Sequence, residues 1–318
     1  MRRAEPLSDN MRGALWLLAS VAGATVMTAT IRLLTPDLHT MMLAFLRSAF
    51  AAVLVVPLLW RPERRATTLR FSLWRLHLFR GLLIGIALNT GFYAIWHLPL
   101  ATATILFFMA PVFATGFAMM FLGEAVGLRR WSAIAAGFAG ALVILRPGVA
   151  ETDPAMVIAL ISSLAFAASL IIGRRLSEVD GTNAVFVSSS LLPVIMTLPP
   201  ALFVWDLPAS TLAWALIGVL VLSSGLRTYA DIRAYAAGDA GFIAPFSYLR
   251  LLTIGGLGYF AFGEQIDGWT LAGGAIIVGA TLYISLREAR LNRNRPHHPA
   301  PDGGDVGARP HDGPPGTS

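Results

Sequence analysis

The chain has 318 residues, of which 56% are hydrophobic and only 13% are charged, and its formal net charge is +6. Soluble globular domains carry about 25% charged residues, so this composition excludes an ordinary soluble protein and indicates that lipid is the main solvent. The absence of cysteine excludes disulfides, thiolate metal sites and a cysteine nucleophile.

Ten apolar segments are predicted in chain order as membrane-spanning helices, because each is close to the length that crosses a bilayer. The first follows a charged N-terminus, as in a signal peptide, but it is longer than a typical signal sequence and lacks a cleavage site, so we expect it to be retained. After the tenth, the Pro-, Gly- and His-rich residues 291–318 predict a disordered cytoplasmic tail. The segments are 12–34, 39–60, 78–97, 101–122, 129–147, 154–174, 183–204, 209–229, 240–262 and 268–286.

All 24 basic residues are arginines. Such a balance could indicate nucleic-acid binding, but most of them lie in short loops between apolar segments, so we expect the lipid bilayer and not nucleic acid as the partner. A cytoplasmic N-terminus gives almost every loop arginine to the cytoplasmic side, which predicts that both termini are cytoplasmic in the cell inner membrane. The arginines assigned to the cytoplasmic side are Arg61, Arg64, Arg65, Arg70, Arg75, Arg129, Arg130, Arg174, Arg175, Arg227, Arg233 and the tail cluster Arg287, Arg290, Arg293 and Arg295.

The chain contains an internal repeat. The stretch "MMFLGEAVGLRRW" is matched some 140 positions later by "YFAFGEQIDGW", which aligns Gly123-Glu124 with Gly263-Glu264 and Trp131 with Trp269. Each copy has five predicted helices, over 12–147 and 154–288, and an odd number forces the copies into opposite orientations. We therefore predict an all-α integral membrane protein of ten transmembrane helices in two inverted-topology five-helix repeats.

The final helix of each repeat begins with tryptophan and is rich in glycine, "WSAIAAGFAGALVILRPG" and "WTLAGGAIIVGATLYISL". With the preceding Gly-Glu turns, these motifs resemble the EamA family of the drug/metabolite transporter superfamily over about residues 12–288. The resemblance implies a secondary transporter. We expect the first four helices of each repeat to enclose the pathway, and helices five and ten to lie at the periphery, where they offer a surface for a homodimer.

Arg250 lies deep in the ninth segment, in "IAPFSYLRLLTIGG". A charge at that depth is costly, so such groups face a cavity or pair with another group. Two interpretations remain: Arg250 binds carbonyl oxygens freed near Pro245, or it receives a substrate anion with a bidentate fork. Arg47 in the second segment is also deep, and both helix positioning and substrate contact remain open for it, since the resembled family often has an arginine there.

No Asp or Glu is expected well inside an apolar segment, so neither deep arginine has a predicted acidic partner, which favours an anionic or zwitterionic small-molecule substrate. The nearest titratable candidates are Asp231, Glu124, Glu264 and His97, and the last three are expected to be interfacial residues or turn caps. The predicted substrate-binding residues are Arg250, Tyr248, Ser247, Asn89, Tyr93, Arg47, Ser223 and Tyr229.

The sequence has no catalytic motif and no metal-ligand set, so we expect neither enzyme activity, a metal nor a cofactor. The function that we predict is transport of a small polar or anionic metabolite by alternating access, with facilitated diffusion or exchange favoured over proton symport. Two alternatives are export of amino acids or their derivatives, and a membrane sensor or scaffold without transport activity.

Overall fold

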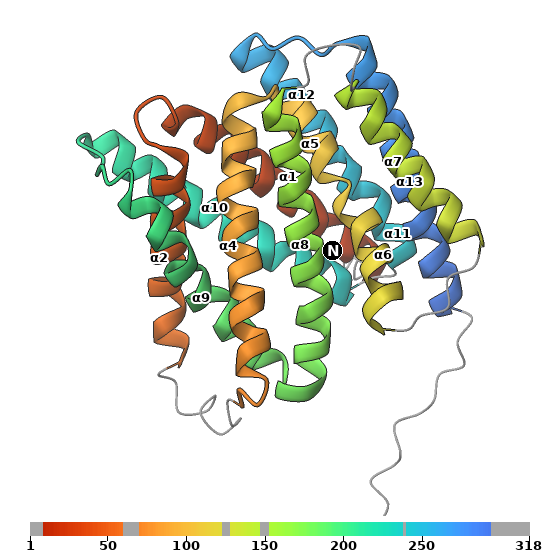
Figure 1. Ribbon diagram of the computed structural model, residues 1–318, viewed down its shortest axis with the longest axis horizontal. Coiled ribbons are helices and arrows are strands. Elements are labelled where there is room, and N and C mark those ends of the chain that lie inside the picture. The colour runs from red at the N-terminus through yellow and green to blue at the C-terminus, as the bar shows by residue number, and fades with distance from the viewer. Residues whose placement is uncertain (1–8, 60–69, 123–127, 147–152, 238–239, 294–318) are drawn as a thin grey trace, which may run out of the picture.

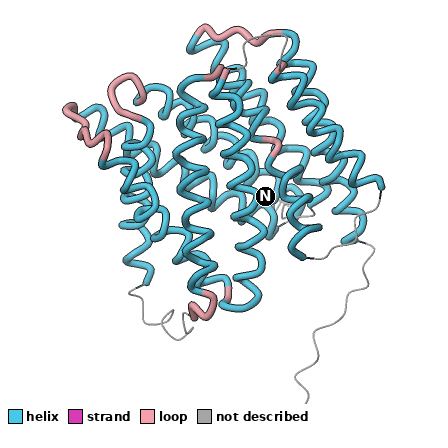
Figure 2. The backbone as a smooth tube through the Cα atoms, viewed as in Figure 1, coloured by secondary structure: helices cyan, strands magenta, loops and turns pink. Residues whose placement is uncertain are grey.

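A computed structural model describes residues 9–59, 70–122, 128–146, 153–237 and 240–293 (Figure 1). Within these ranges the chain is helical with short loops at the helix ends and no strand (Figure 2). The loop arginines Arg61, Arg64 and Arg65, the first Gly-Glu turn at Gly123-Glu124, and the tail from residue 294 lie outside the described residues. Residues 291–293, predicted to begin the tail, are still helical.

The helices follow the predicted segments closely, because a backbone without water must bond within its own helix. Four helices extend further than predicted by four residues or more: α4 begins at Trp74, α8 ends at Asp180, α10 ends at Ala237 and α13 ends at Arg293. The bounds are α1 Asp9–Leu34, α2 Thr40–Leu59, α4 Trp74–His97, α5 Leu100–Phe107, α6 Ala110–Leu122, α7 Leu128–Leu145, α8 Pro154–Asp180, α9 Thr182–Leu202, α10 Thr211–Ala237, α11 Ala240–Ile243, the 3-10 helix η1 Ala244–Tyr248, α12 Leu249–Phe262 and α13 Gly268–Arg293.

Two segments predicted as single helices are interrupted. Segment 101–122 breaks between α5 and α6 at Phe108 and Met109, and segment 240–262 passes through η1 before α12 begins. Pro111 lies just after the first break and Pro245 lies within η1, and proline cannot donate the backbone hydrogen bond to the preceding turn. The two prolines therefore explain why each segment changes its helical geometry there.

Local sequence signals define several helix ends. The Asp153 carboxylate accepts a hydrogen bond from the Ala155 N–H at 2.8 Å, and Pro154 occupies the first turn of α8. At the end of α12, Gly263 has a φ of 65°, and the N–H groups of Gly263 and Glu264 both donate to the Gly258 carbonyl. Glycine adopts this left-handed conformation without strain, so α12 ends sharply there.

Helices that are distant in the sequence lie side by side. The most extensive pairs are α1 with α10, α4 with α8, α7 with α13, and α2 with α9, and α5 packs against α12 (Figure 1). Each pair joins a helix before residue 146 to one after residue 153. The core is thus shared between the two halves of the chain.

Glycines allow close helix contacts. A Cβ atom at Gly81 would lie 2.6 Å from the Leu192 Cβ, and one at Gly85 would lie 2.8 Å from the Met196 Cβ. These two glycines therefore serve helix packing, here of α4 against α9.

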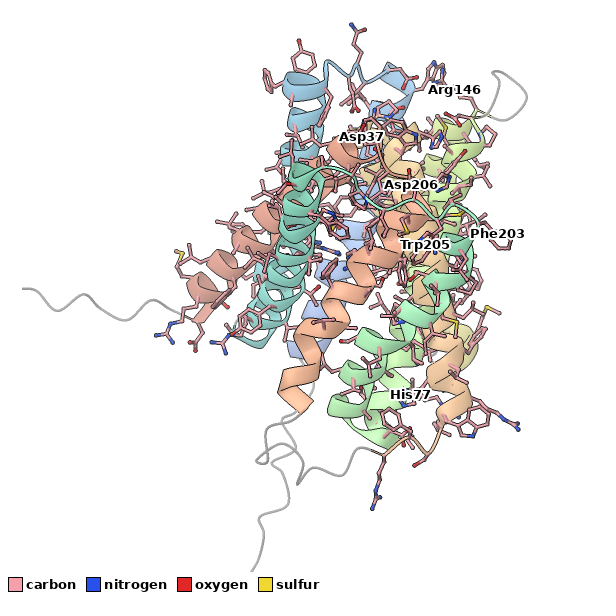
Figure 3. The ribbon with its side chains drawn as sticks, turned by 90° about the vertical axis from the view of Figure 1, so that its left-hand side faces the viewer. Asp37, His77, Arg146, Phe203, Trp205 and Asp206 are labelled. Carbon is pink, nitrogen blue, oxygen red and sulfur yellow. The ribbon has the colours of Figure 1, made fainter. Side chains whose placement is uncertain are left out.

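Six helices in the described ranges are long and apolar enough to cross a bilayer, including α1, α4 and α8; α2, α7 and α13 contain shorter apolar stretches. The chain is therefore a multi-pass helical membrane protein. Its two ends are marked in Figure 3, where Asp37, Arg146 and Asp206 lie at one end, called the acidic end below, and His77 lies at the other, the His77 end.

Candidate functional site

Arg250 has an acidic partner, contrary to the prediction that no carboxylate would be available to it. Its Nη2 atom lies 2.6 Å from Asp231 Oδ1 and 2.6 Å from Ser20 Oγ, and Ser20 in turn donates to the same Asp231 oxygen. Arg250 Nε is buried without a hydrogen-bond partner. The Nη2 nitrogen of Arg250 is thus hydrogen-bonded, while its Nε nitrogen is not.

The error came from the predicted end of the eighth segment at residue 229. The stretch "ADIRA" after residue 229 was left outside the predicted segment, yet α10 continues to Ala237 and includes Asp231. Asp231 is therefore inside a helix that packs on α1, where its carboxylate meets Ser20. An i, i+4 spacing of Arg227 and Asp231 was the sequence signal for a shared helix face.

Two further arginines extend this cluster of charges. Arg227 of α10 is partly buried, and its guanidinium is repelled by Arg250 and attracted by Asp231. Arg47 of α2 is also partly buried, is repelled by Arg227, and has a buried Nε without a hydrogen-bond partner among the described residues. We call Arg47, Arg227, Arg250 and Asp231 together the arginine group. Arg227 lies within α10, inside the predicted segment 209–229.

Asn89 and Ser223 are two of the other predicted site residues. Asn89 donates from Nδ2 to the Gly85 carbonyl of its own helix at 3.0 Å, and its Oδ1 is buried without a partner. Ser223 is buried and donates to the Leu220 carbonyl, so its hydroxyl is used within α10. Asn89 keeps a free acceptor, whereas the Ser223 hydroxyl proton is already committed.

The aromatic candidates contact other rings. Tyr93 stacks on His97 with ring centroids 3.9 Å apart, and Tyr248 stacks on Phe108 at 5.1 Å. The second contact joins η1, which also contains Ser247, to the break between α5 and α6. Tyr248 therefore connects the two interrupted segments of the chain.

Tyr229 lies on a different face of α10 from Arg227. About half of its side chain is exposed, at 53%, and its ring packs edge-on against Trp16 and under the Arg233 guanidinium. The structure thus separates Tyr229 from the arginine group, because side chains two residues apart on a helix point in nearly opposite directions.

Glu264 has the capping role that was expected of it. Its Oε2 accepts from the Leu100 N–H at 2.6 Å, and its Oε1 pairs with Arg32 Nη2 at 2.9 Å. Arg146 and Asp267 form a second ion pair at the same end of the molecule. Hydrogen bonds from Thr270, with the nearby Arg146 charge, lower the pKa of Asp267 below its usual value.

A buried cluster at the His77 end was not anticipated from the sequence. Asp180 accepts hydrogen bonds from the N–H groups of Ser72 and Leu73, and His77 Nε2 lies 3.2 Å from the same carboxylate. His77 Nδ1 lies 2.8 Å from Ser188 Oγ. Since α4 begins directly after Leu73, Asp180 holds the ends of α4 and α8 together. Within the described ranges, no three His, Cys, Asp or Glu side chains form a metal-binding group.

The comparisons with known proteins agree with this architecture. The profile of the EamA-like transporter family matches residues 11–146. A solved crystal structure covers 88% of this chain, and 98% of its own chain is covered, with a TM-score of 0.58 at 18% identity, which shows a shared fold.

Three relatives are similar over nearly their whole length. The riboflavin transporter of Rhizobium johnstonii is 30% identical, with 88% of this chain and 93% of the relative covered. The S-adenosylmethionine uptake transporter of Rickettsia felis is 29% identical, with 90% and 96% covered, and the pseudopaline exporter CntI of Pseudomonas aeruginosa is 28% identical, with 85% and 95% covered. The chain thus belongs to the EamA-like transporter family.

Proposed function

We propose that this protein moves a small metabolite with a negatively charged group across the cell inner membrane by alternating access. The arginine group carries the proposal: three guanidinium groups lie near one another within membrane-spanning segments, with Asp231 as the acidic contact among the described residues. Charges at such a depth are rare and expensive, and they mark ion or substrate pathways. A substrate carboxylate or phosphate would supply the missing negative charge.

Asn89 and Tyr248 complete the proposed substrate site. The buried Asn89 Oδ1 is an acceptor for a hydroxyl or ammonium group of the substrate. Tyr248 stacks on Phe108 at the two helix breaks, where a change in helix geometry would alter access. Ser247 lies in η1, Tyr93 in α4 and Ser223 in α10. Tyr229 has no part in this proposal.

Two inverted repeats, 12–147 and 154–288, supply the proposed mechanism. In this proposal the segments correspond in chain order: α1 to α8, α2 to α9, α4 to α10, α5–α6 to α11–α12, and α7 to α13. The contact between α1 and α10 then corresponds to the contact between α8 and α4. The pairs α2 with α9, α5 with α12 and α7 with α13 then map onto themselves. This is the contact pattern that a two-fold axis between the repeats would produce, and it supports the proposal of ten membrane-spanning segments.

We place both termini in the cytoplasm. At the acidic end, Arg32 and Arg146 are neutralised by Glu264 and Asp267, whereas arginines near the His77 end, including Arg75 and Arg233, contact aromatic rings. Unneutralised arginine at one end favours the cytoplasmic side there. Cysteine accessibility in this cysteine-free chain offers a direct measurement, with reporters at exposed positions 37 and 75.

The test is flux and binding with purified protein in proteoliposomes, using a panel of anionic, zwitterionic, neutral and cationic metabolites. We expect uptake or exchange of anions, and its loss in Arg250→Gln with partial retention in Arg250→Lys, since lysine keeps the charge but not the fork. Normal anion transport by both folded variants would refute the role of Arg250. A folded protein that moves none of the panel would refute transport and leave the sensor or scaffold alternative.

Export of an amino acid or its derivative is the second candidate. The observation that favours it is the buried Asn89 Oδ1, an acceptor without a partner among the described residues, which offers a contact for an ammonium group. Competition by carboxylates but not by amines would separate anion transport from this alternative. The relatives are named for S-adenosylmethionine, riboflavin and pseudopaline, so the cargo differs among them and does not decide between the two.

A further inference from the structure

Two of the three arginines in the arginine group, Arg47 and Arg227, donate no hydrogen bond to another described residue. Both residues are partly buried, and Arg47 Nε is fully buried. Each has five N–H donors and a permanent charge. Burying such a group without an acceptor is costly, so we expect an anion that is not part of the chain to bind these guanidinium groups.

Arg80 shows how this protein satisfies a deep arginine that has a structural role. Its Nε donates to the Ser169 carbonyl at 2.9 Å, and its Nη1 donates to Ser189 Oγ. A Cβ at Gly173 would lie 2.8 Å from Arg80 Nε, so α8 leaves space for the guanidinium. Arg80 is thus held by two neighbouring helices. Arg47 and Arg227 have no comparable contacts, which argues against a purely structural role for them.

The charges of the arginine group can be added directly. Arg47, Arg227 and Arg250 contribute three positive charges, and Asp231, which contacts Arg250 and attracts Arg227, contributes one negative charge. The remainder is two positive charges. Asp231 and Ser20 engage Arg250 Nη2, so the two arginines without hydrogen bonds account for the remainder.

We infer that the substrate carries two negative charges, and that Arg47 and Arg227 each neutralise one of them. This inference rests on the proposed function, because it specifies the charge of the transported anion. A dianion brings the formal charge of the arginine group to zero, whereas a monoanion leaves one charge and a neutral molecule leaves two. In a membrane interior, where uncompensated charge is costly, the neutral assembly is the most stable.

Two kinds of small dianion have this chemistry, namely a dicarboxylate and a phosphate monoester. Both present oxygens that match the planar donor fork of arginine. Succinate and glycerol 3-phosphate serve as probes of the two kinds. Butyrate, a monoanion with the same four-carbon length as succinate, and succinamide, its neutral diamide, serve as the reference compounds.

The experiment measures thermal stabilisation of the purified full chain by each probe, and counterflow of each probe in proteoliposomes. We expect a dianion to bind at least tenfold more tightly than butyrate, and succinamide not to bind. A response to succinate alone identifies the substrate as a dicarboxylate, and a response to glycerol 3-phosphate alone identifies it as a phosphate monoester. Equal binding of butyrate and both dianions would overturn the inference while leaving anion transport intact. Binding of cationic or neutral metabolites without any anion would overturn the proposed function as well.

Charge-removing variants make the test specific. In Arg47→Gln and in Arg227→Gln the formal charge of the group falls to one, so the preference for dianion over monoanion should fall by about tenfold or more. Arg233→Gln is the matched control, because Arg233 lies on the same helix but against Trp16 and Tyr229. A variant that merely unfolds loses both ligands together. An unchanged preference in both folded variants would contradict the inference.

Discussion

Arg32 and Glu264 lie 232 positions apart in the chain and meet at the acidic end, with Arg32 Nη2 2.9 Å from Glu264 Oε1. Arg32 Nη1 also donates to the carbonyls of Ile95 and Trp96 at the end of α4, and Glu264 accepts from the Leu100 N–H at the start of α5. Side-chain exposure is 20% for Arg32 and 10% for Glu264. The Arg32–Glu264 ion pair therefore connects α1, the α4–α5 turn and the α12–α13 turn.

Glu264→Gln should destabilise the protein by about 1.5–3 kcal/mol, because the amide can still cap Leu100 but cannot accept from a guanidinium as a carboxylate does. Thermal unfolding in detergent measures this effect. Arg32→Gln should have a similar effect, and the double variant should lose clearly less than the sum of the two. Additive losses would show that Arg32 and Glu264 are not coupled.

Asp180→Asn should lower the stability by about 2–4 kcal/mol. The carboxylate accepts two backbone N–H groups before α4 and faces His77, so its replacement leaves a buried donor unsatisfied. Glu178→Gln is the control two residues earlier, since Glu178 is 64% exposed and its pair with Arg174 spans 3.8 Å. We expect a change of less than about 0.5 kcal/mol for the control. Equal midpoints for the two variants would rule out the capping role of Asp180.

Gly273→Ala should separate α7 from α13. A Cβ at Gly273 would lie 2.5 Å from the Gly140 carbonyl oxygen and 2.5 Å from Ile144 Cγ1, and the backbone atom cannot move without the helix. We expect a loss of about 1–3 kcal/mol. Gly279→Ala in the same helix meets nothing within 4 Å and should be neutral, or stabilising by up to about 1 kcal/mol. The idea fails if both alanine variants melt together with the unaltered protein.

The lowered pKa of Asp267 predicts that the protein loses stability in acid. Its pKa is lowered in the folded protein, chiefly by the Thr270 hydrogen bonds and also by Arg146, so the unfolded chain binds the proton more readily. The stabilisation is complete above the usual aspartate pKa of about 3.9 and is lost as the pH falls through the lower folded value. Asp267→Asn should unfold at a lower temperature than the unaltered protein at neutral pH, and the difference should shrink in acid. A difference that stays constant down to acid pH would contradict this mechanism.

The ends of the helices show where sequence patterns were sufficient. Apolar segments located nearly all of the helices, because a backbone in lipid must form helices wherever it crosses, and the Gly263-Glu264 turn was recognised from its residues. The patterns failed where a polar run continued a helix, as at Asp231, since polarity alone does not tell a loop from a helix whose polar face is covered by other helices. They also missed the two helix breaks, although the prolines were visible.

The sequence by itself determined that this chain is a helical membrane protein, because hydrophobicity and segment length are properties of short stretches. It also singled out Arg47 and Arg250 as deep charges. Only the tertiary structure decided their surroundings: Asp231 and Ser20 approach Arg250 from α10 and α1, and Arg227 joins Arg47. The charge that a site presents is a sum over several helices, and that sum is fixed only when the helices pack together.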